Sequence, residues 1–202
     1  MADFFESIVM QQRLWLSLHL LGVCVGLGGA SITDMLFFKF LKDFRISRKE
    51  AGIMHTLSLA IVGALLVIFI SGFALYLLDP AKFSGSPTFT TKMIIVMILT
   101  LNGMLLHLYV SPKLVHLSFS SKQSLPPKYR SLRHLAFGLG AVSATSWYFT
   151  FFLAMLKSVI PENVSALHLL GLYGIIVISA ILVSQCMEYG FQRSVSRKQR
   201  GK

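Results

Sequence analysis

Charged residues are scarce in this chain of 202 residues: they make up 13% of it, and only eight are Asp or Glu. There are two cysteines, too few for a small domain held together by several disulfides. Hydrophobic residues, in contrast, make up 54%, and the mean hydropathy is +0.69. A soluble core of this length cannot bury so much apolar surface, which excludes both a soluble enzyme and a disordered tail protein. We therefore expect an integral membrane protein.

Five long intervals carry no charged residue, and each reaches the roughly 20 residues that a helix needs to cross about 30 Å of hydrocarbon. The intervals are continuously apolar and do not alternate, so barrel strands do not fit them. The predicted spans are 14–38, 51–78, 93–112, 134–156 and 163–187, the first being extended past Asp34. The sequence thus predicts an all-α fold, a polytopic bundle of five transmembrane helices. One membrane domain covers 1–202, and 188–202 form a basic cytoplasmic tail.

The basic residues predict an orientation. Fifteen of the 19 Lys and Arg residues lie between spans one and two, between spans three and four, or after span five. By the positive-inside rule these segments face the cytoplasm, which gives N-terminus out and C-terminus in. The expected location is a bacterial inner membrane. We expect the basic tail to contact anionic headgroups of the lipid bilayer, and no nucleic acid.

Six histidines in so apolar a chain are the main indication of function, because ionisable groups at membrane depth are costly. On the predicted topology His19 and His168 lie near the outer surface, on spans one and five. His55, His107 and His134 lie near the inner surface, on spans two, three and four. The sixth, His116, falls in an inner loop. The sequence therefore separates the histidines into two layers.

A b-type haem needs an axial imidazole and small residues beside it, and helix bundles build such sites from facing helices. Gly22 and Gly26 follow His19 at i+3 and i+7, on the histidine's own face, and leave a groove for a flat ring. His19 with His168 would be an outer pair of ligands. The same glycines are also the small-xxx-small pattern that packs helices closely.

The inner pair would be two of His55, His107 and His134. One or two haems b would then carry electrons within or across the membrane, with a quinone and a redox partner protein as candidate partners. Such a protein is a membrane oxidoreductase or an electron carrier. A non-catalytic assembly subunit, and a homo-oligomer, are further alternatives.

A methionine stripe provides a competing interpretation. Met93, Met97 and Met104 share one face of span three with His107, and thioether and imidazole groups are ligands suited to Cu(I). The alternative function is thus a copper permease or export accessory. Methionine is also a common packing residue, so the stripe alone does not identify a metal path.

Two further polar features lie within the spans. Asp34 is expected to pair with Lys39 or another basic loop residue, and a proton relay beside the inner histidines is the alternative. Span four carries Ser143 and a run of hydroxyl residues after it, which either bond to helix carbonyls or form a polar pocket for a quinone headgroup or a haem propionate.

Span one reads His19-Leu-Leu-Gly22-Val-Cys-Val-Gly26-Leu-Gly-Gly-Ala, Lys92 opens span three, and Pro112 closes it. In these features the chain resembles small bacterial inner-membrane proteins of the copper-resistance D type and the haem-dependent J-type protoporphyrinogen oxidases. The resemblance implies that His19 ligates haem or lies on a metal path, with Lys92 as a second candidate. Of the tryptophan-rich signature of the J-type oxidases, span one has only Trp15.

Overall fold

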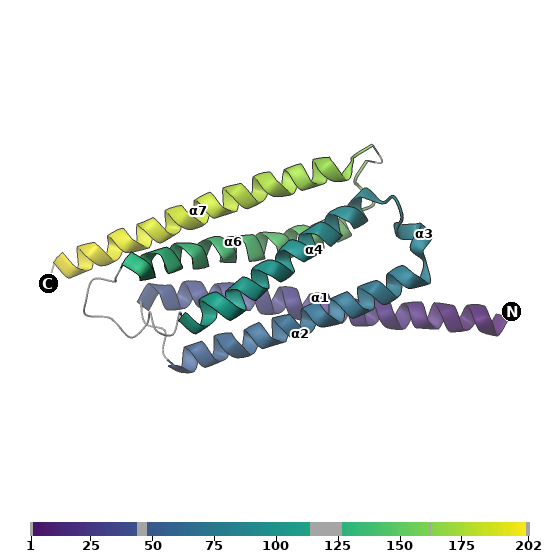
Figure 1. Cartoon of the computed structure of the whole chain (residues 1–202), viewed down its shortest axis with the longest axis horizontal. Coiled ribbons are helices and arrows are strands. Elements are labelled where there is room, and N and C mark those ends of the chain that lie inside the picture. The colour runs from purple at the N-terminus through teal and green to yellow at the C-terminus, as the bar shows by residue number, and fades with distance from the viewer. Residues whose placement is uncertain (1, 44–47, 114–126, 162, 201–202) are drawn as a thin grey trace.

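A computed structural model describes residues 2–43, 48–113, 127–161 and 163–200. His116 and the rest of 114–126 lie outside these residues. Within them the chain forms helices, joined by short turns (Figure 1). The helices are α1 (Ala2–Asp43), α2 (Arg48–Leu78), α3 (Pro80–Phe83), α4 (Pro87–Leu105), the π-helix η1 (Leu106–Val110), α6 (Pro127–Met155) and α7 (Ala166–Arg200).

Five of the helical segments are long and apolar enough to cross a membrane, as the sequence predicts. They are Met10–Phe37, Lys49–Leu78, Pro87–Lys113, His134–Met155 and Ala166–Gly190. The helices themselves extend beyond the predicted spans. With 42 residues, α1 is about 63 Å long at 1.5 Å per residue, twice the thickness of the hydrocarbon layer. The orientation in the membrane stays a prediction.

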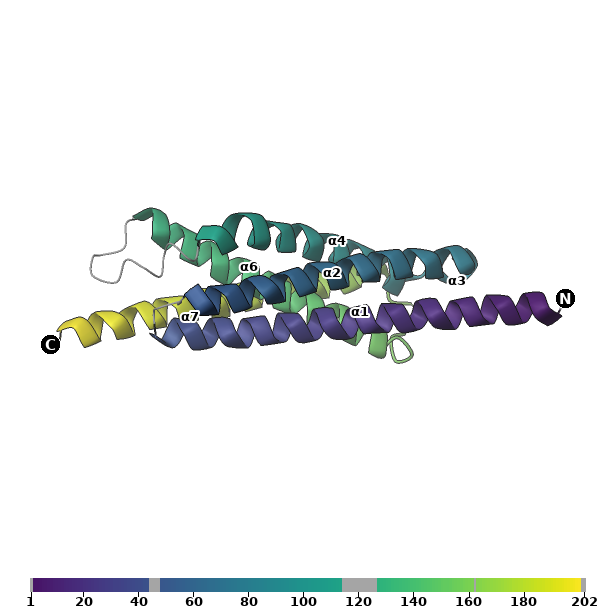
Figure 2. The same cartoon turned by 90° about the horizontal axis from the view of Figure 1, so that it is seen from below.

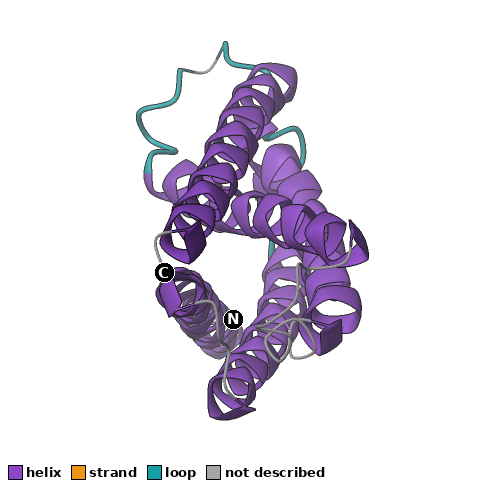
Figure 3. Ribbon diagram, turned by 90° about the vertical axis from the view of Figure 1, so that its left-hand side faces the viewer, coloured by secondary structure: helices purple, strands orange, loops and turns teal. Residues whose placement is uncertain are grey.

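The long helices run roughly parallel to one another in an elongated bundle (Figures 1 and 2). The principal packing pairs are α1 with α2, α6 with α7, and α4 with α6. Seen end-on, the helices surround the long axis of the bundle (Figure 3). We call the end that carries the N-terminus the N-end and the opposite end, which carries the C-terminus, the C-end.

The bundle shows apolar residues on its outside and polar residues within it. Large apolar side chains such as Leu20, Phe73 and Ile175 are more than half exposed, whereas Thr91 and Ser146 are fully buried. The buried hydroxyls bond to carbonyls of their own helices: Thr91 donates to Pro87 O at 2.8 Å and Ser146 to Val142 O at 2.6 Å. Hydroxyl groups satisfied in this way tolerate a low-dielectric interior. The arrangement fits a bundle surrounded by lipid.

The central core forms where α1 comes close to α6. Trp147 of α6 is 5% exposed and packs with Ala30, Leu65 and two further buried residues. Its ring lies against Gly26 of α1, where a Cβ atom would stand 2.3 Å from the indole ring. Only glycine permits this approach of the helix backbone to the ring. Gly26 therefore determines how closely α1 packs on α6.

Candidate functional site

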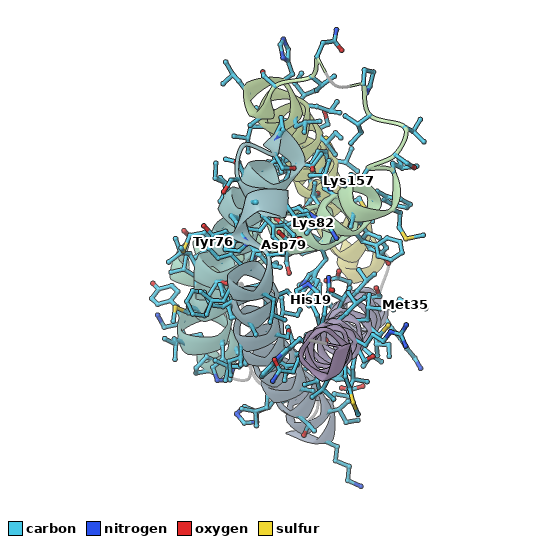
Figure 4. The ribbon with its side chains drawn as sticks, turned by 90° about the vertical axis from the view of Figure 1, so that its right-hand side faces the viewer. His19, Met35, Tyr76, Asp79, Lys82 and Lys157 are labelled. Carbon is cyan, nitrogen blue, oxygen red and sulfur yellow. The ribbon has the colours of Figure 1, made fainter. Side chains whose placement is uncertain are left out.

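His19 is held against α2 by a polar contact. Its Nδ1 lies 3.1 Å from Oγ of Ser71, which is 1% exposed. Gly72, one residue after Ser71, lets the ring come close, because a Cβ there would be 3.3 Å from His19 Cε1. Seen from the N-end, His19 projects from α1 towards the middle of the bundle (Figure 4). The contacts fix the ring by its Nδ1 edge and leave Nε2 as the atom for a ligand.

One lysine acts on this histidine from another helix. Lys92, half-buried in the first turns of α4, is close enough to repel a positive charge on His19, and Lys157, exposed in the turn that follows α6, repels Lys92. Among the described residues neither lysine has an ion pair. Asp79, the nearby acidic residue labelled in Figure 4, accepts from Lys82 N at 3.2 Å as the cap of α3. We call His19, Lys92 and Lys157 the N-end basic cluster.

The structure does not bring His168 to His19. His168 lies in the first turn of α7, where its Nδ1 is 2.8 Å from Ser165 Oγ and its side chain is exposed. Helix α7 packs mainly on α6 and α4, whereas α1 packs mainly on α2 and α6. The two histidines are thus at the same end of the bundle on helices that both pack on α6 but not to a comparable extent on each other.

The expected groove beside His19 is filled by side chains. A Cβ at Gly22 would lie 2.9 Å from Ile68, and Gly26 faces the Trp147 ring. Both glycines therefore serve close helix packing in this structure, which was the alternative reading of their spacing.

The C-end histidines separate into a pair and a single residue. The rings of His55 and His107 have centroids 5.8 Å apart and planes inclined by 35°. His107 Nδ1 is 2.8 Å from Ser58 Oγ on α2, so the ring is fixed in the same manner as His19. His134 lies apart, between α6 and α7. Of the predicted inner ligands, the structure therefore brings together His55 and His107.

A cavity of about 420 Å³ opens beside His107, between α1, α2, α4, η1 and α6. Most of its wall is apolar, and its glycines, Gly103 and Gly140, have open space where a Cβ would stand. The polar side chains that line it are Thr33, Asp34, Ser58, Thr100, His107, Ser111 and Ser143. Within the described residues Asp34 makes no ion pair, so the expected pairing with Lys39 is not formed. Asp34 lines the cavity instead, as His107 does.

The methionine stripe lies on the outer surface of the bundle. Met93, Met97 and Met104 are 46%, 57% and 56% exposed on the outer surface of the bundle. Only Met104 lines the cavity together with His107, whose Nδ1 is engaged by Ser58. The exposed thioethers thus belong to the apolar outer surface of the bundle, where methionine is an ordinary apolar residue.

Sequence reasoning missed the partners of His134. Its Nδ1 lies 2.8 Å from Gln185 Oε1 and 3.1 Å from Glu188 Oε2, and the hydrogen-bond geometry favours Gln185. Glu188 is 1% exposed, whereas the His134 side chain is 45% exposed. The sequence did contain a signal for this contact. Glu188 is an acidic residue that directly follows the uncharged interval of span five and precedes the basic tail.

Replacing Glu188 by alanine is expected to destabilise the α6–α7 pairing by about 2 kcal/mol, because most of a fully buried side chain is removed and a cavity is left where α6 and α7 pack. Glu188→Gln retains the volume and one amide oxygen, and we expect it to cost less than half as much. His134→Ala should also cost less, because that side chain is nearly half exposed. Unfolding in mixed detergent micelles with increasing dodecyl sulfate measures the three variants; equal stability of Glu188→Ala and wild type would contradict the expectation.

No family model, curated protein or solved structure matches the chain.

Proposed function

We propose that the protein is a membrane-embedded b-type haem protein of the bacterial inner membrane, in which His19 ligates the iron. The observation that carries the proposal is the fixed orientation of His19 beside a half-buried lysine, Lys92, that makes no ion pair among the described residues. A metal-binding imidazole typically has its second nitrogen engaged by a polar partner, and Ser71 Oγ at 3.1 Å from Nδ1 supplies that partner.

The two lysines favour haem over a bare metal ion. A cation near the imidazole repels a metal ion, whereas haem b carries two propionate carboxylates at one edge of an apolar macrocycle. Lys92 and Lys157 are suited to pair with these carboxylates while His19 Nε2 binds the iron. Pairing would also offset the cost of holding a half-buried lysine within a span. The residues present therefore fit the group.

The function that follows is electron transfer at the N-end of the bundle. The haem supplies one-electron chemistry, and the chain's own residues fix the imidazole, neutralise the propionates and exclude water with the surrounding apolar helices. With the N-terminus outside, as the basic residues favour, this site lies near the outer surface. A redox partner on that side is part of the proposal.

The first test is an absorption spectrum of the detergent-purified protein, expressed with ample haem supply. We expect a Soret band that shifts on reduction by dithionite, with close to one haem per chain by pyridine haemochrome assay. Purified protein without a Soret band rejects the proposal. A band that is removed by a second chromatography step, while the protein stays monodisperse, rejects it as well, because the haem is then not held by the chain.

A further inference from the structure

We infer that the C-end cavity is a binding site for the headgroup of a lipid-soluble quinone, with His107, Asp34 and Ser143 as its polar contacts. This site is distinct from the N-end basic cluster and does not depend on haem being bound there. Three properties of the cavity carry the inference: its size, its access from the lipid side, and the placement of its polar groups.

The size suits a single substituted ring. Ligand cavities of small molecules begin at roughly 300 Å³, and this one has about 420 Å³. A one-ring headgroup with the first part of its tail fills such a volume. Gly103 of α4 and Gly140 of α6 keep the cavity wide, because neither has a neighbour within 4 Å of the position of a Cβ.

The cavity borders the outer surface of the bundle. Leu66 and Phe69 of α2 line it while being 59% and 39% exposed, and Met104 and Leu108 are 56% and 71% exposed on the other side. Because these residues belong both to the cavity wall and to the apolar outer surface, a molecule dissolved in the bilayer can enter the cavity between them. A ligand from the bilayer has an apolar tail, which this edge accommodates.

A quinone ring carries two carbonyl oxygens that point in opposite directions, so its polar contacts have to come from different sides of the cavity. The polar groups of this cavity lie on different helices. His107 lies on η1, Asp34 on α1 and Ser143 on α6. Ser58 Oγ, at 2.8 Å from His107 Nδ1, can donate its hydrogen there, which places the imidazole hydrogen on Nε2 as a donor for a carbonyl. Ser143 makes no hydrogen bond within the described residues, so its hydroxyl can donate to the second carbonyl of the ring; Asp34, which makes no ion pair there, can donate as the protonated carboxylic acid.

The backbone next to His107 has an unusual form. At Leu106–Val110 the helix widens into a single π-helical turn, a feature that occurs frequently at functional sites. His107 and Leu108 of this turn line the cavity. The π-turn thereby places the histidine in the wall at the point where α4 meets α6.

Trp147 provides the measurement, because it packs with Ala30 and Leu65, which line the cavity, and quinones quench tryptophan emission. In the Trp15→Phe variant Trp147 is the only tryptophan. We titrate this variant in detergent with decylubiquinone and expect saturable quenching. A haem at the N-end would lower only the starting intensity. Quenching that rises linearly without saturation, as for partition into the micelle, overturns the proposal.

Cavity-filling variants locate the site. Gly103→Leu and Gly140→Leu, each added to Trp15→Phe, are expected to raise the dissociation constant at least tenfold. The matched control is Gly171→Leu on α7, a helical glycine with equally open space that does not line the cavity, and it should leave the constant unchanged. Unchanged binding in both cavity variants overturns the proposal.

Polar variants and a tail-only probe identify the headgroup, and they decide the matter even if the leucine variants fail to fold. His107→Phe and Ser143→Ala are each expected to weaken binding about tenfold, the effect of one lost hydrogen bond to a buried ligand. 1-Bromodecane, a quencher with the same chain and no quinone ring, should not saturate. Binding that is insensitive to both polar variants, or equal affinity for 1-bromodecane, shows a site for alkyl chains and overturns the proposal.

Discussion

Replacing His19 by alanine is expected to remove at least nine-tenths of the haem from the purified protein. The variant takes away the imidazole that would bind the iron, while the polar partner Ser71 and the cations Lys92 and Lys157 remain. The propionates alone do not hold a porphyrin in detergent, because single ion pairs near a surface contribute about 1 kcal/mol or less. The measurement is the ratio of Soret to protein absorbance after the same purification as wild type.

The matched control is His168→Ala. His168 lies at the same end of the bundle and is exposed, with Ser165 as its partner, so its loss should leave haem content unchanged. A haem content that falls equally in both variants would mean that the outer pair, and not His19 alone, holds the iron. A haem content that falls in neither would remove His19 from the site altogether.

Ser71→Ala separates orientation from ligation. The change leaves His19 Nε2 in place and removes only the hydroxyl at Nδ1. Loss of such a partner typically weakens metal binding by about 10- to 100-fold, so haem content should fall while the spectral shape of the remaining haem is retained.

Lys92→Gln should lower haem content without altering the reduced spectrum, as expected for a propionate partner.

The five spans could be predicted because each is a local property of composition. Uncharged runs of about 20 residues determine where a helix crosses the membrane, and all five agree with the observed helices. The ends were less predictable. Helix α1 continues to Asp43 and α7 to Arg200, beyond the predicted spans, because helical hydrogen bonding does not stop at a charged residue once the chain leaves the hydrocarbon.

The pairing of the candidate ligands was not predictable from depth alone. Depth follows from position along a helix, but contact also depends on which helices are neighbours and how each is rotated. His19 and His168 share a depth and have separate partners, whereas His55 and His107 meet because α2 and η1 are adjacent. Ser71 and Ser58, which orient His19 and His107, are ordinary serines in the sequence and become informative only through these contacts.

Gly26→Leu is expected to prevent correct packing of α1 on α6, with a loss of more than 3 kcal/mol. The first atom of the new side chain would stand 2.3 Å from Trp147 Cη2, and that ring is buried and cannot turn away. Overpacking by even one or two methylene groups costs about 1–3 kcal/mol in a close-packed interior. The expected results are a low yield of monodisperse protein and an early transition in dodecyl sulfate titration.

Gly28→Leu is the matched control, since Gly28 lies on the same helix with nothing within 4 Å of its Cβ position. It should fold as well as wild type, because leucine is the better helix former.

The clash itself is tested by a double-variant cycle. Gly26→Ala and Trp147→Phe are each expected to destabilise, the first by overpacking and the second by leaving a void beside Ala30 and Leu65. Combined, they should cost less than the sum of the two, because the shorter phenyl ring leaves room for the alanine methyl group. Strict additivity would show that the glycine is not required by the indole ring, and the close approach of α1 to α6 would then need another cause.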